Sequence, residues 1–507
     1  LAGATYVIHV DTSGSYVGGA ASNGVYIAPD TVGDGRISVD LYLFPQGTSI
    51  GTYFATAVKT FTVYSLRPSY ITINQTIGNT PTTPVEMFEE GEYGMSHSAT
   101  ENVIAWIRSE SHLYLGHYNR RSSLGAPMQL KQLSDSAKSK YANNVAATIS
   151  GEITAADPII KDVWLKLPTF YYKGEKMVGE DDKWKIYFAK EMPAGETGWS
   201  MWDGKNLIAV YKAVVINSNL YSISGTKPST NISLQNFKNY ARARGNGFRL
   251  VTYEAHKIMA LLFYAWYGTT DSQAQCGYGT KNSITVNETT TYYPKVNGLC
   301  NDYGMSDTNN ITGNGAGEPN ESQIEAGMGN DIKSVNFWGL ENWWGDLYEY
   351  CDDIYTVSKA DMVTTLNTES TKTINVDGVD GIYTASDVQN MSEDIRCLKI
   401  VNARNDSTLK YYILSNMSGG YIRQMTLGEG CDVMPKTIGG SSTTFYSDGS
   451  NVYAGSGFGL IRSSYSANTN GGVGYFSANN TGSNAAIGSR LLYEGESVIL
   501  RDDESFE

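Results

Sequence analysis

The segment Phe337-Trp-Gly-Leu-Glu-Asn-Trp-Trp-Gly-Asp-Leu-Tyr-Glu-Tyr-Cys-Asp-Asp-Ile354 is the most distinctive stretch of the chain. Its first eight residues contain three tryptophans and one phenylalanine, and side chains of this size anchor hydrophobic cores. From Leu347 onward, aliphatic, acidic and thiol side chains alternate with tyrosines, and a period of two predicts a β-strand. The segment therefore predicts an aromatic-rich part of the core, followed directly by a β-strand.

Two amphipathic helices are expected before this segment. The first covers residues 234–243 and ends before Gly245. The second is capped by Thr252 and carries Glu254 in its first turn, where a carboxylate complements the helix dipole. Apolar residues of the second helix repeat with the helical period and predict a core-facing stripe: Ala255, Ile258, Met259, Leu262, Phe263 and Trp266.

Strands are expected around these helices, at residues 164–172, 184–188 and 207–215. The mixture predicts an α+β fold for residues 161–507. Its core is expected to be built on Phe248, Leu250, Trp266, Trp343, Trp344 and Leu347.

The first third of the chain differs from the rest. Residues 1–84 contain short β-prone runs separated by turn residues, and this pattern predicts a small all-β, sandwich-like domain. Residues 85–160 are interpreted as a connecting or oligomerising region, with helical character at residues 96–108. The polar stretch 131–147 is compatible with either a helix or a flexible arm.

Charge and cysteine content exclude several classes of protein. The net charge of the 507-residue chain is −14 at pH 7, and an acidic chain without a basic stripe is a poor partner for nucleic acid. The longest apolar run, residues 258–267, is too short to cross a bilayer, so no membrane insertion is expected. Five cysteines without CxxC spacing favour buried free thiols, with Cys276 and Cys300 as the only local pair worth testing.

Residues 437–490 form a low-charge segment rich in small polar residues. Of these 54 residues, 33 are Ser, Gly, Asn or Thr, and aromatic residues recur among them. A flexible linker is one interpretation. The recurring aromatics favour ordered loops in which tyrosines anchor and small polar residues adapt. The candidate ligand-binding residues are Tyr446, Asn451, Tyr453, Tyr465, Ser466, Asn468, Asn470, Tyr475, Asn479 and Asn480.

Three motifs, in this order, resemble one family. Gly247-Phe-Arg-Leu-Val-Thr-Tyr-Glu-Ala255, Gly345-Asp-Leu-Tyr-Glu-Tyr350 and the closing segment that ends in Ile487-Gly-Ser-Arg490 resemble motifs of the formylglycine-generating-enzyme type of C-type lectin fold. Gly440-Ser-Ser-Thr-Thr-Phe-Tyr446 and Ala486-Ile-Gly-Ser-Arg-Leu-Leu492 are closer to its non-enzymatic branch. That branch comprises phage tail-fibre and surface receptor-binding proteins, some of them diversified by retroelements.

The resemblance implies a receptor-binding adhesin on a virion tail or an extracellular surface. Its implied fold is an α+β C-type lectin domain, preceded by the β domain and the connecting region. Its implied partner is a host cell-surface glycan or protein, and fibre-like adhesins of this kind are often homotrimers. Asn, Ser and Tyr side chains suit both kinds of receptor, since aromatics pack on apolar faces while hydroxyls and amides form hydrogen bonds.

An enzyme is the less favoured interpretation. Enzymes of the family use a cysteine pair near the position of Ser464, and no cysteine follows Cys431, so a thiolate site in the closing segment is excluded. The acidic residues near Glu349 could in principle act as acid and base. No cofactor is expected, although the acidic runs at residues 302–307 and 352–353 leave calcium open. A structural tail or pilus subunit with a decorative lectin-like domain is a further alternative.

Overall fold

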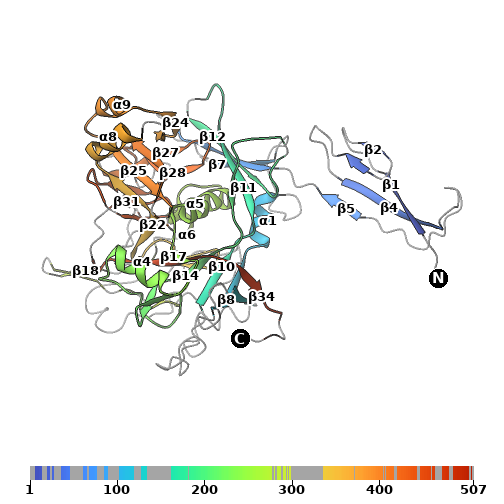
Figure 1. Ribbon diagram of the computed structural model, residues 1–507, viewed down its shortest axis with the longest axis horizontal. Helices are drawn as coiled ribbons and strands as arrows, with labels where there is room; N and C mark the ends of the chain where they lie inside the picture. Colours follow the sequence, from blue (N-terminus) through green and yellow to red (C-terminus); the bar gives the residue numbers. More distant parts are fainter. Residues whose placement is uncertain are drawn as a thin grey trace.

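The computed structural model describes residues 6–13, 20–22, 25–27, 36–45, 61–64, 68–76, 85–89, 102–118, 127–133, 162–180, 182–193, 195–276, 279, 283–286, 289–292, 294, 296–298, 335–369, 372–402, 405, 407–415, 419–441, 446–457, 459–462, 471–478, 483–501 and 504. Figure 1 shows the arrangement of its helices and strands.

The described chain is mostly β, and the expected α+β C-type lectin fold is wrong. Strands far outnumber the helices, which are α1 (Val103–Ser109), α4 (Leu234–Arg242), α5 (Tyr253–Tyr267), α6 (Ser272–Cys276), α8 (Lys359–Thr368) and α9 (Ala385–Gln389). The expectation was based on the amphipathic patterns that became α4 and α5. Both helices form, but the strands of residues 373–438 build a large sheet that these two patterns do not indicate.

The largest sheet has eleven strands. Its order is β24 (Val379–Ile382), β23 (Thr373–Val376), β26 (Thr408–Leu414), β25 (Arg396–Val401), β22 (Tyr348–Val357), β30 (Gly459–Arg462), β31 (Phe476–Ala478), β29 (Gly449–Val452), β27 (Gly420–Leu427) and β28 (Asp432–Ile438), with β32 (Ile487–Gly488) paired to β22. The strand expected from Leu347 onward is therefore confirmed as β22, in the middle of this sheet.

A seven-stranded sheet joins distant parts of the chain. Its order is β17 (Phe248–Leu250), β33 (Arg490–Glu494), β14 (Asn206–Lys212), β10 (Asp162–Lys166), β8 (His112–His117), β9 (Met128–Gln132) and β34 (Ser497–Ile499). A five-stranded sheet has the order β13 (Ser200–Trp202), β11 (Phe170–Lys176), β12 (Lys183–Ala189), β6 (Ser69–Asn74) and β7 (Val85–Glu89).

The remaining strands form small sheets. A three-stranded sheet consists of β1 (Tyr6–Ser13), β4 (Arg36–Pro45) and β5 (Phe61–Tyr64). The two-stranded pairs are β2 (Ala20–Ser22) with β3 (Val25–Ile27), β15 (Val214–Ile216) with β16 (Asn219–Tyr221), β18 (Ser283–Val286) with β19 (Thr289–Tyr292), and β20 (Asn336–Phe337) with β21 (Leu340–Glu341).

The strand pairing crosses the expected domain boundaries at residues 84 and 160. β6 lies before residue 84, yet it pairs with β12 of the expected C-terminal domain. β8 lies in the expected connecting region, yet it pairs with β10. The structure thus integrates these parts of residues 69–132 into the same sheets as the rest of the body.

Helix α5 occupies the centre of the body, with the five-stranded sheet on one side and the eleven-stranded sheet on the other (Figure 1). Thr252 caps its first turn, accepting from the backbone N–H of Ala255, and Gly268 ends it in the left-handed conformation with φ 63°. The capped start agrees with the sequence prediction. Each of the six residues expected to form the core is buried: Phe248, Leu250, Trp266, Trp343, Trp344 and Leu347.

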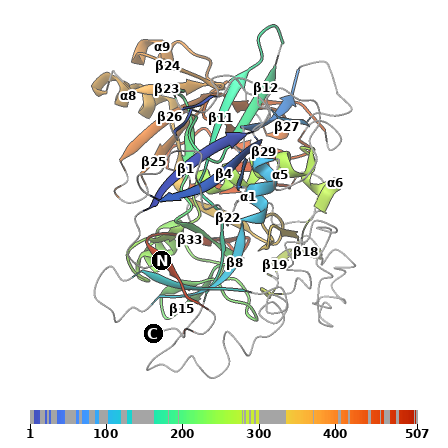
Figure 2. The ribbon, with the colours of Figure 1, turned by 90° about the vertical axis from the view of Figure 1, so that its right-hand side faces the viewer.

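Helices α8 and α9 gather with β23 and β24 at one end of the eleven-stranded sheet (Figures 1 and 2). They cover a separate apolar cluster that includes Met362, Ile374 and Tyr411. The opposite face of the same strands packs against Tyr253 of α5 through Leu398 and Tyr412. This end of the sheet is therefore covered on both faces, and α8 forms an outer layer.

Candidate functional site

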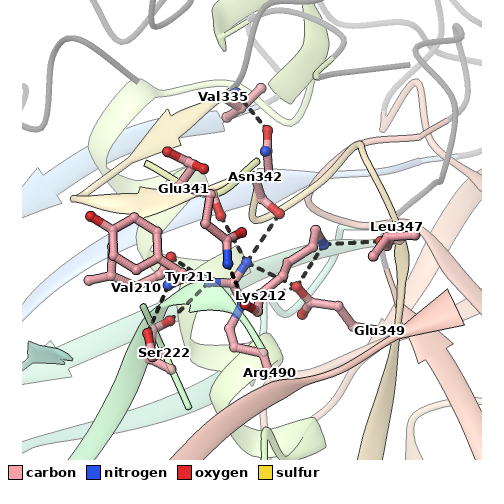
Figure 3. Close-up of polar contacts among 12 residues, drawn as sticks. Val210, Tyr211, Lys212, Ser222, Val335, Glu341, Asn342, Leu347, Glu349 and Arg490 are labelled. Carbon is pink, nitrogen blue, oxygen red and sulfur yellow. Dashed lines mark hydrogen bonds and ion pairs between the residues drawn. The ribbon is translucent and has the colours of Figure 1, made fainter. Parts of the chain in front are cut away.

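A buried ion network lies at the junction of the two large sheets (Figure 3). Glu349 on β22 accepts from Lys212 Nζ at 2.7 Å and from Arg490 Nε at 3.0 Å. All three side chains are at most 1% exposed. Because one carboxylate faces two cations without access to water, the network suits a structural connection and not proton transfer with a ligand.

Arg490 also ties several loops to this network. Its Nη1 donates to the carbonyl oxygens of Ala209 and Val210, and its Nη2 to those of Glu341 and Asn342 (Figure 3). The guanidinium lies 5.3 Å from the ring centroid of Trp343. Planar guanidinium groups combine such donation and stacking in one side chain, so Arg490 holds β33, β14 and the tryptophan-rich loop together.

The pKa values of Glu349 and Lys212 both lie below their ordinary values, but for different reasons. Burial alone would raise the pKa of Glu349, but Arg490 and Lys212 outweigh it and hold that pKa below its ordinary value. Burial lowers the pKa of Lys212, although Glu349 opposes that effect. The carboxylate therefore remains ionised, as a structural counter-ion should.

Asp352 and Asp353 connect β22 to the start of α5. Asp352 Oδ1 lies 3.0 Å from Lys238 Nζ, and its Oδ2 accepts from the backbone N–H of Leu250 at 3.1 Å. Asp353 accepts from the backbone N–H of Tyr253 at 2.8 Å. Burial raises the pKa of Asp353 to about 7, even though the N–H of Tyr253 opposes the shift. Within the part of the chain that the structure describes, no His, Cys, Asp and Glu side chains gather as a metal site.

The described cysteines are Cys276, Cys351, Cys397 and Cys431, and all four are buried free thiols. Burial raises the pKa of Cys276 and of Cys397 to about 12. Thiols with so high a pKa are poor nucleophiles. Cys300, and with it the suggested Cys276–Cys300 pair, lies outside the described residues.

Two candidate binding tyrosines of the C-terminal segment are core residues. Tyr446 is fully buried, and its hydroxyl donates to Gln75 Oε1 at 2.7 Å. Tyr475 is 7% exposed, and its ring centroid lies 6.0 Å from that of Tyr348. Neither ring is presented to a receptor, because both complete the packing of the body.

Asn451 and Tyr453 are the described candidates that face solvent, and Tyr453 is 57% exposed. Asn451 lies on β29, and Tyr453 follows that strand directly. The other candidates lie outside the described residues: Tyr465, Ser466, Asn468, Asn470, Asn479 and Asn480. Of the expected surface, the structure thus brings together one exposed pair.

The chain continues from Tyr453 into the rim of a cavity of about 460 Å³. The cavity is lined by Gln235, Lys238, Tyr355, Thr356, Val357, Asp361, Thr365, Lys399, Val401, Tyr411, Ser456 and Gly457. Its residues come from α4, β22, α8, β25, β26 and the turn after β29. The volume falls within the range of about 300–1,000 Å³ that is typical of small-molecule sites.

A cross-strand row forms the floor of this cavity. Tyr355 on β22 stands opposite Lys399 on β25, and Lys399 stands opposite Tyr411 on β26. Residues that stand opposite each other on paired strands share a face of the sheet. The row is therefore aromatic, cationic and aromatic in turn.

One wall of the cavity is held by Lys238 of α4. Its Nζ donates to the Tyr355 hydroxyl at 2.8 Å and lies 5.4 Å from the centroid of the same ring. The ion pair with Asp352 fixes the amine from below. The orientation of Tyr355 is thus set before any ligand arrives.

The opposite wall is the first turn of α8. Asp361 accepts from the hydroxyls of Ser456 and Ser358, and these hydrogen bonds lower its pKa. Gly457 donates its backbone N–H to the Thr356 carbonyl at 3.0 Å. These bonds hold Ser456 and Gly457 in place in the lining of the cavity.

Two polar groups of the floor are left to interact with a ligand. Among the described residues, neither the Lys399 amine nor the Tyr411 hydroxyl has a hydrogen-bond or ion-pair partner. Tyr411 is nevertheless only 4% exposed. An ammonium donor and a phenol that stand side by side in a cavity suit a ligand with several oxygen acceptors.

Sequence reasoning did not identify these cavity residues. Arg396–Val401 and Thr408–Leu414 are short segments rich in β-prone residues, and Lys399 interrupts the apolar run of the first. That single lysine was the available signal. The cavity itself could not be predicted, because its lining residues are spread from residue 235 to residue 457.

Comparison with known proteins does not add an assignment: no protein-family model matches the chain, and a search of curated proteins finds no matching sequence. Over the residues that the structure describes, no helix is both long and apolar enough to cross a membrane. The geometry of the cavity and of the C-terminal segment is therefore the main basis for a functional proposal.

Proposed function

We propose that this protein is a receptor-binding adhesin that recognises a sugar-bearing ligand on a host surface. The ligand would enter the cavity between α4 and α8 and also contact the exposed Asn451 and Tyr453. In this proposal the protein acts outside the cell or on a virion tail, as a homotrimer.

The observation that carries the proposal is the floor row of the cavity. Tyr355 and Tyr411 are the cross-strand neighbours of Lys399. The half-buried Tyr355 can pack its ring on the apolar face of a sugar, whereas Tyr411, only 4% exposed, offers its hydroxyl. Lys399 donates to ring or carboxylate oxygens, and Asp361 beside Ser456 accepts from sugar hydroxyls.

A binding role is also favoured by what the acidic and thiol groups do. Glu349, Asp352 and Asp353 are buried in ion pairs or bonded to backbone N–H groups, and the described thiols are buried. These acidic and thiol groups have structural roles in the body. The polar groups that line the cavity suit the binding of a ligand.

The test is a binding screen of the full chain against a glycan array and a panel of host surface proteins. Lys399→Met should raise the dissociation constant for a bound glycan by about tenfold or more, since it removes a donor from the cavity floor. Lys227→Met is the matched control: it removes the same charge from an exposed loop outside the cavity. A glycan bound equally by both variants, or a screen in which only proteins bind, would contradict the proposal.

A further inference from the structure

The three-stranded sheet of β1, β4 and β5 has two contrasting faces. β4 is antiparallel to both of its neighbours, and the register sets Val10 opposite Leu41 and Val39 opposite Phe61. Residues that stand opposite each other share a face, and successive residues of a strand alternate between the two faces. The register therefore assigns every residue of the sheet to one face or the other.

One of these faces is mostly apolar. β4 supplies four aliphatic residues to it, at positions 37, 39, 41 and 43, and the neighbouring strands add Ile8, Val10, Phe61 and Val63. The other face carries polar and charged residues, among them His9, Asp11 and Asp40. Because a sheet with an apolar face needs a second layer to cover it, the first face requires a partner.

The described chain does not supply that second layer. Figure 1 shows the three-stranded sheet apart from the helices and strands of the body. The β2–β3 hairpin has three residues in each strand, about 10 Å, whereas the ten residues of β4 extend over about 34 Å. The hairpin is therefore too short to cover the apolar face.

The two edges of the sheet indicate how copies of the chain can associate. Among the described strands, β1 and β5 each pair on one side only, with β4. Since both are antiparallel to β4, they are parallel to each other. In a ring of copies around an axis along the strands, β5 of one copy meets β1 of the next as a parallel pair. Such a ring leaves no open edge, and open edges are a liability.

The number of strands selects three copies. About eight strands close a barrel whose interior is just filled by side chains, and many more leave a channel. Three copies of this sheet give nine strands, whereas two give six and four give twelve. At roughly 16 Å² of sheet per residue, the strands of three copies bury on the order of 1,000 Å² of apolar face, which reaches the size of a specific interface.

We propose that three copies of this chain associate through the N-terminal sheet, with the apolar faces turned inward around a threefold axis. β5 of each copy pairs with β1 of the next, and the face with His9, Asp11 and Asp40 is the outer surface. The inference rests on the homotrimer of the proposed function, but not on its ligand, and it names the surface that forms the trimer. The simpler alternative is that another part of the same chain covers the apolar face.

Sedimentation velocity of the full chain at micromolar concentration is the first test. The unmodified protein should sediment as a trimer. Leu41→Glu places a charge on the apolar face, where burial without a partner is costly, so it should convert the trimer to monomers. Tyr42→Glu is the matched control: it adds the same charge at the next residue, which lies on the outer face, and it should remain trimeric.

Cysteine crosslinking keeps the test decisive even if Leu41→Glu unfolds the sheet. Position 41 of each copy would lie at the same height around the axis, so the thiols introduced by Leu41→Cys should be joined between copies by a short bismaleimide. The thiols introduced by Tyr42→Cys, on the outer face, should not be joined. The unmodified chain, which has five cysteines of its own, gives the background.

Three outcomes would overturn the inference. One is an unmodified chain that sediments as a monomer, and another is an unmodified chain that sediments as a dimer. The third is a trimer that survives Leu41→Glu and gives no crosslink with Leu41→Cys, because another surface would then hold the copies together. The glycan screen is a separate test. Lys399→Met should stay trimeric, so a trimer that binds no glycan would contradict the proposed ligand and not this interface.

Discussion

Glu349 Oε1 lies 2.7 Å from Lys212 Nζ, and the two side chains are 0% and 1% exposed. The pair joins β22 of the eleven-stranded sheet to β14 of the seven-stranded sheet. A contact of this kind, removed from water and shared with Arg490, makes the relative position of the two sheets depend on a few charges.

Removal of one partner should therefore be costly. Lys212→Met removes the hydrogen bonds to Glu349 and to the Leu347 carbonyl, while Arg490 still balances the buried carboxylate. It should therefore lower the free energy of unfolding by about 1–3 kcal/mol. Urea denaturation measures the change. Lys205→Met is the matched control, because its ion pair with Glu496 is equally short, 2.7 Å, but is exposed, and it should leave stability nearly unchanged. Equal effects of the two variants would contradict this role of the buried network.

The local features of the fold could be predicted from the sequence. β22, α4 and α5 follow from periodicity and from a capping threonine, because those signals act within a few residues. The fold class could not be predicted in the same way. Strands β23 to β28 form three local hairpins, and the Asp-Gly turn between β23 and β24 is a signal that the sequence does carry. The pairings of β22 with β25 and of β23 with β26 join more distant segments, and no local pattern shows them.

The candidate binding surface illustrates a second limit. Composition identified Tyr446 and Tyr453 as equivalent members of one surface, yet one is fully buried and the other is 57% exposed. A tyrosine can anchor either a core or an interface, since its ring is apolar and its hydroxyl needs a partner in both settings. Only the three-dimensional neighbours distinguish the two roles.

This difference between tyrosines predicts opposite mutant phenotypes. Tyr446→Phe removes a buried hydroxyl and leaves Gln75 Oε1 without that donor, so it should lower the free energy of unfolding by about 1–3 kcal/mol. Tyr453→Ala should leave stability nearly unchanged and, under the proposed function, weaken glycan binding. Denaturation of both variants, together with the glycan screen, separates the roles. A destabilised Tyr453→Ala would show that the exposed ring also supports the core.

The raised pKa of Asp353 predicts a dependence of stability on pH. In the folded state this carboxyl has a pKa of about 7, against an ordinary value of 3.8, so the folded state holds more protons between these values. Stability from this group is complete below about pH 4 and falls as the pH rises through 7. Asp353→Asn should remove that part of the fall.

The measurement is the midpoint of thermal unfolding from pH 4 to pH 8. Asp353→Asn should be relatively more stable than the unmodified protein at the high end, because a neutral amide can still accept from the N–H of Tyr253. Asp394→Asn, at an exposed position, is the control and should run parallel to the unmodified protein. Parallel curves for both variants would mean that Asp353 is ionised throughout the range.

The close contact between two sheets at Gly174 predicts a purely steric effect on stability. The backbone N–H of Gly174 on β11 donates to the Glu429 carbonyl at 3.0 Å, which joins the five-stranded sheet to the turn between β27 and β28. A Cβ at Gly174 would collide with the carbonyl oxygen of Gly428, and backbone cannot move aside as a side chain can. Gly174→Ala should therefore lower the free energy of unfolding by about 1–3 kcal/mol.

Gly430→Ala is the matched control, because the nearest atom to its added methyl group, Asp432 Oδ2, lies at an ordinary 3.5 Å. If urea denaturation found both alanine variants equally stable, the turn would not be packed against β11 as closely as this contact requires.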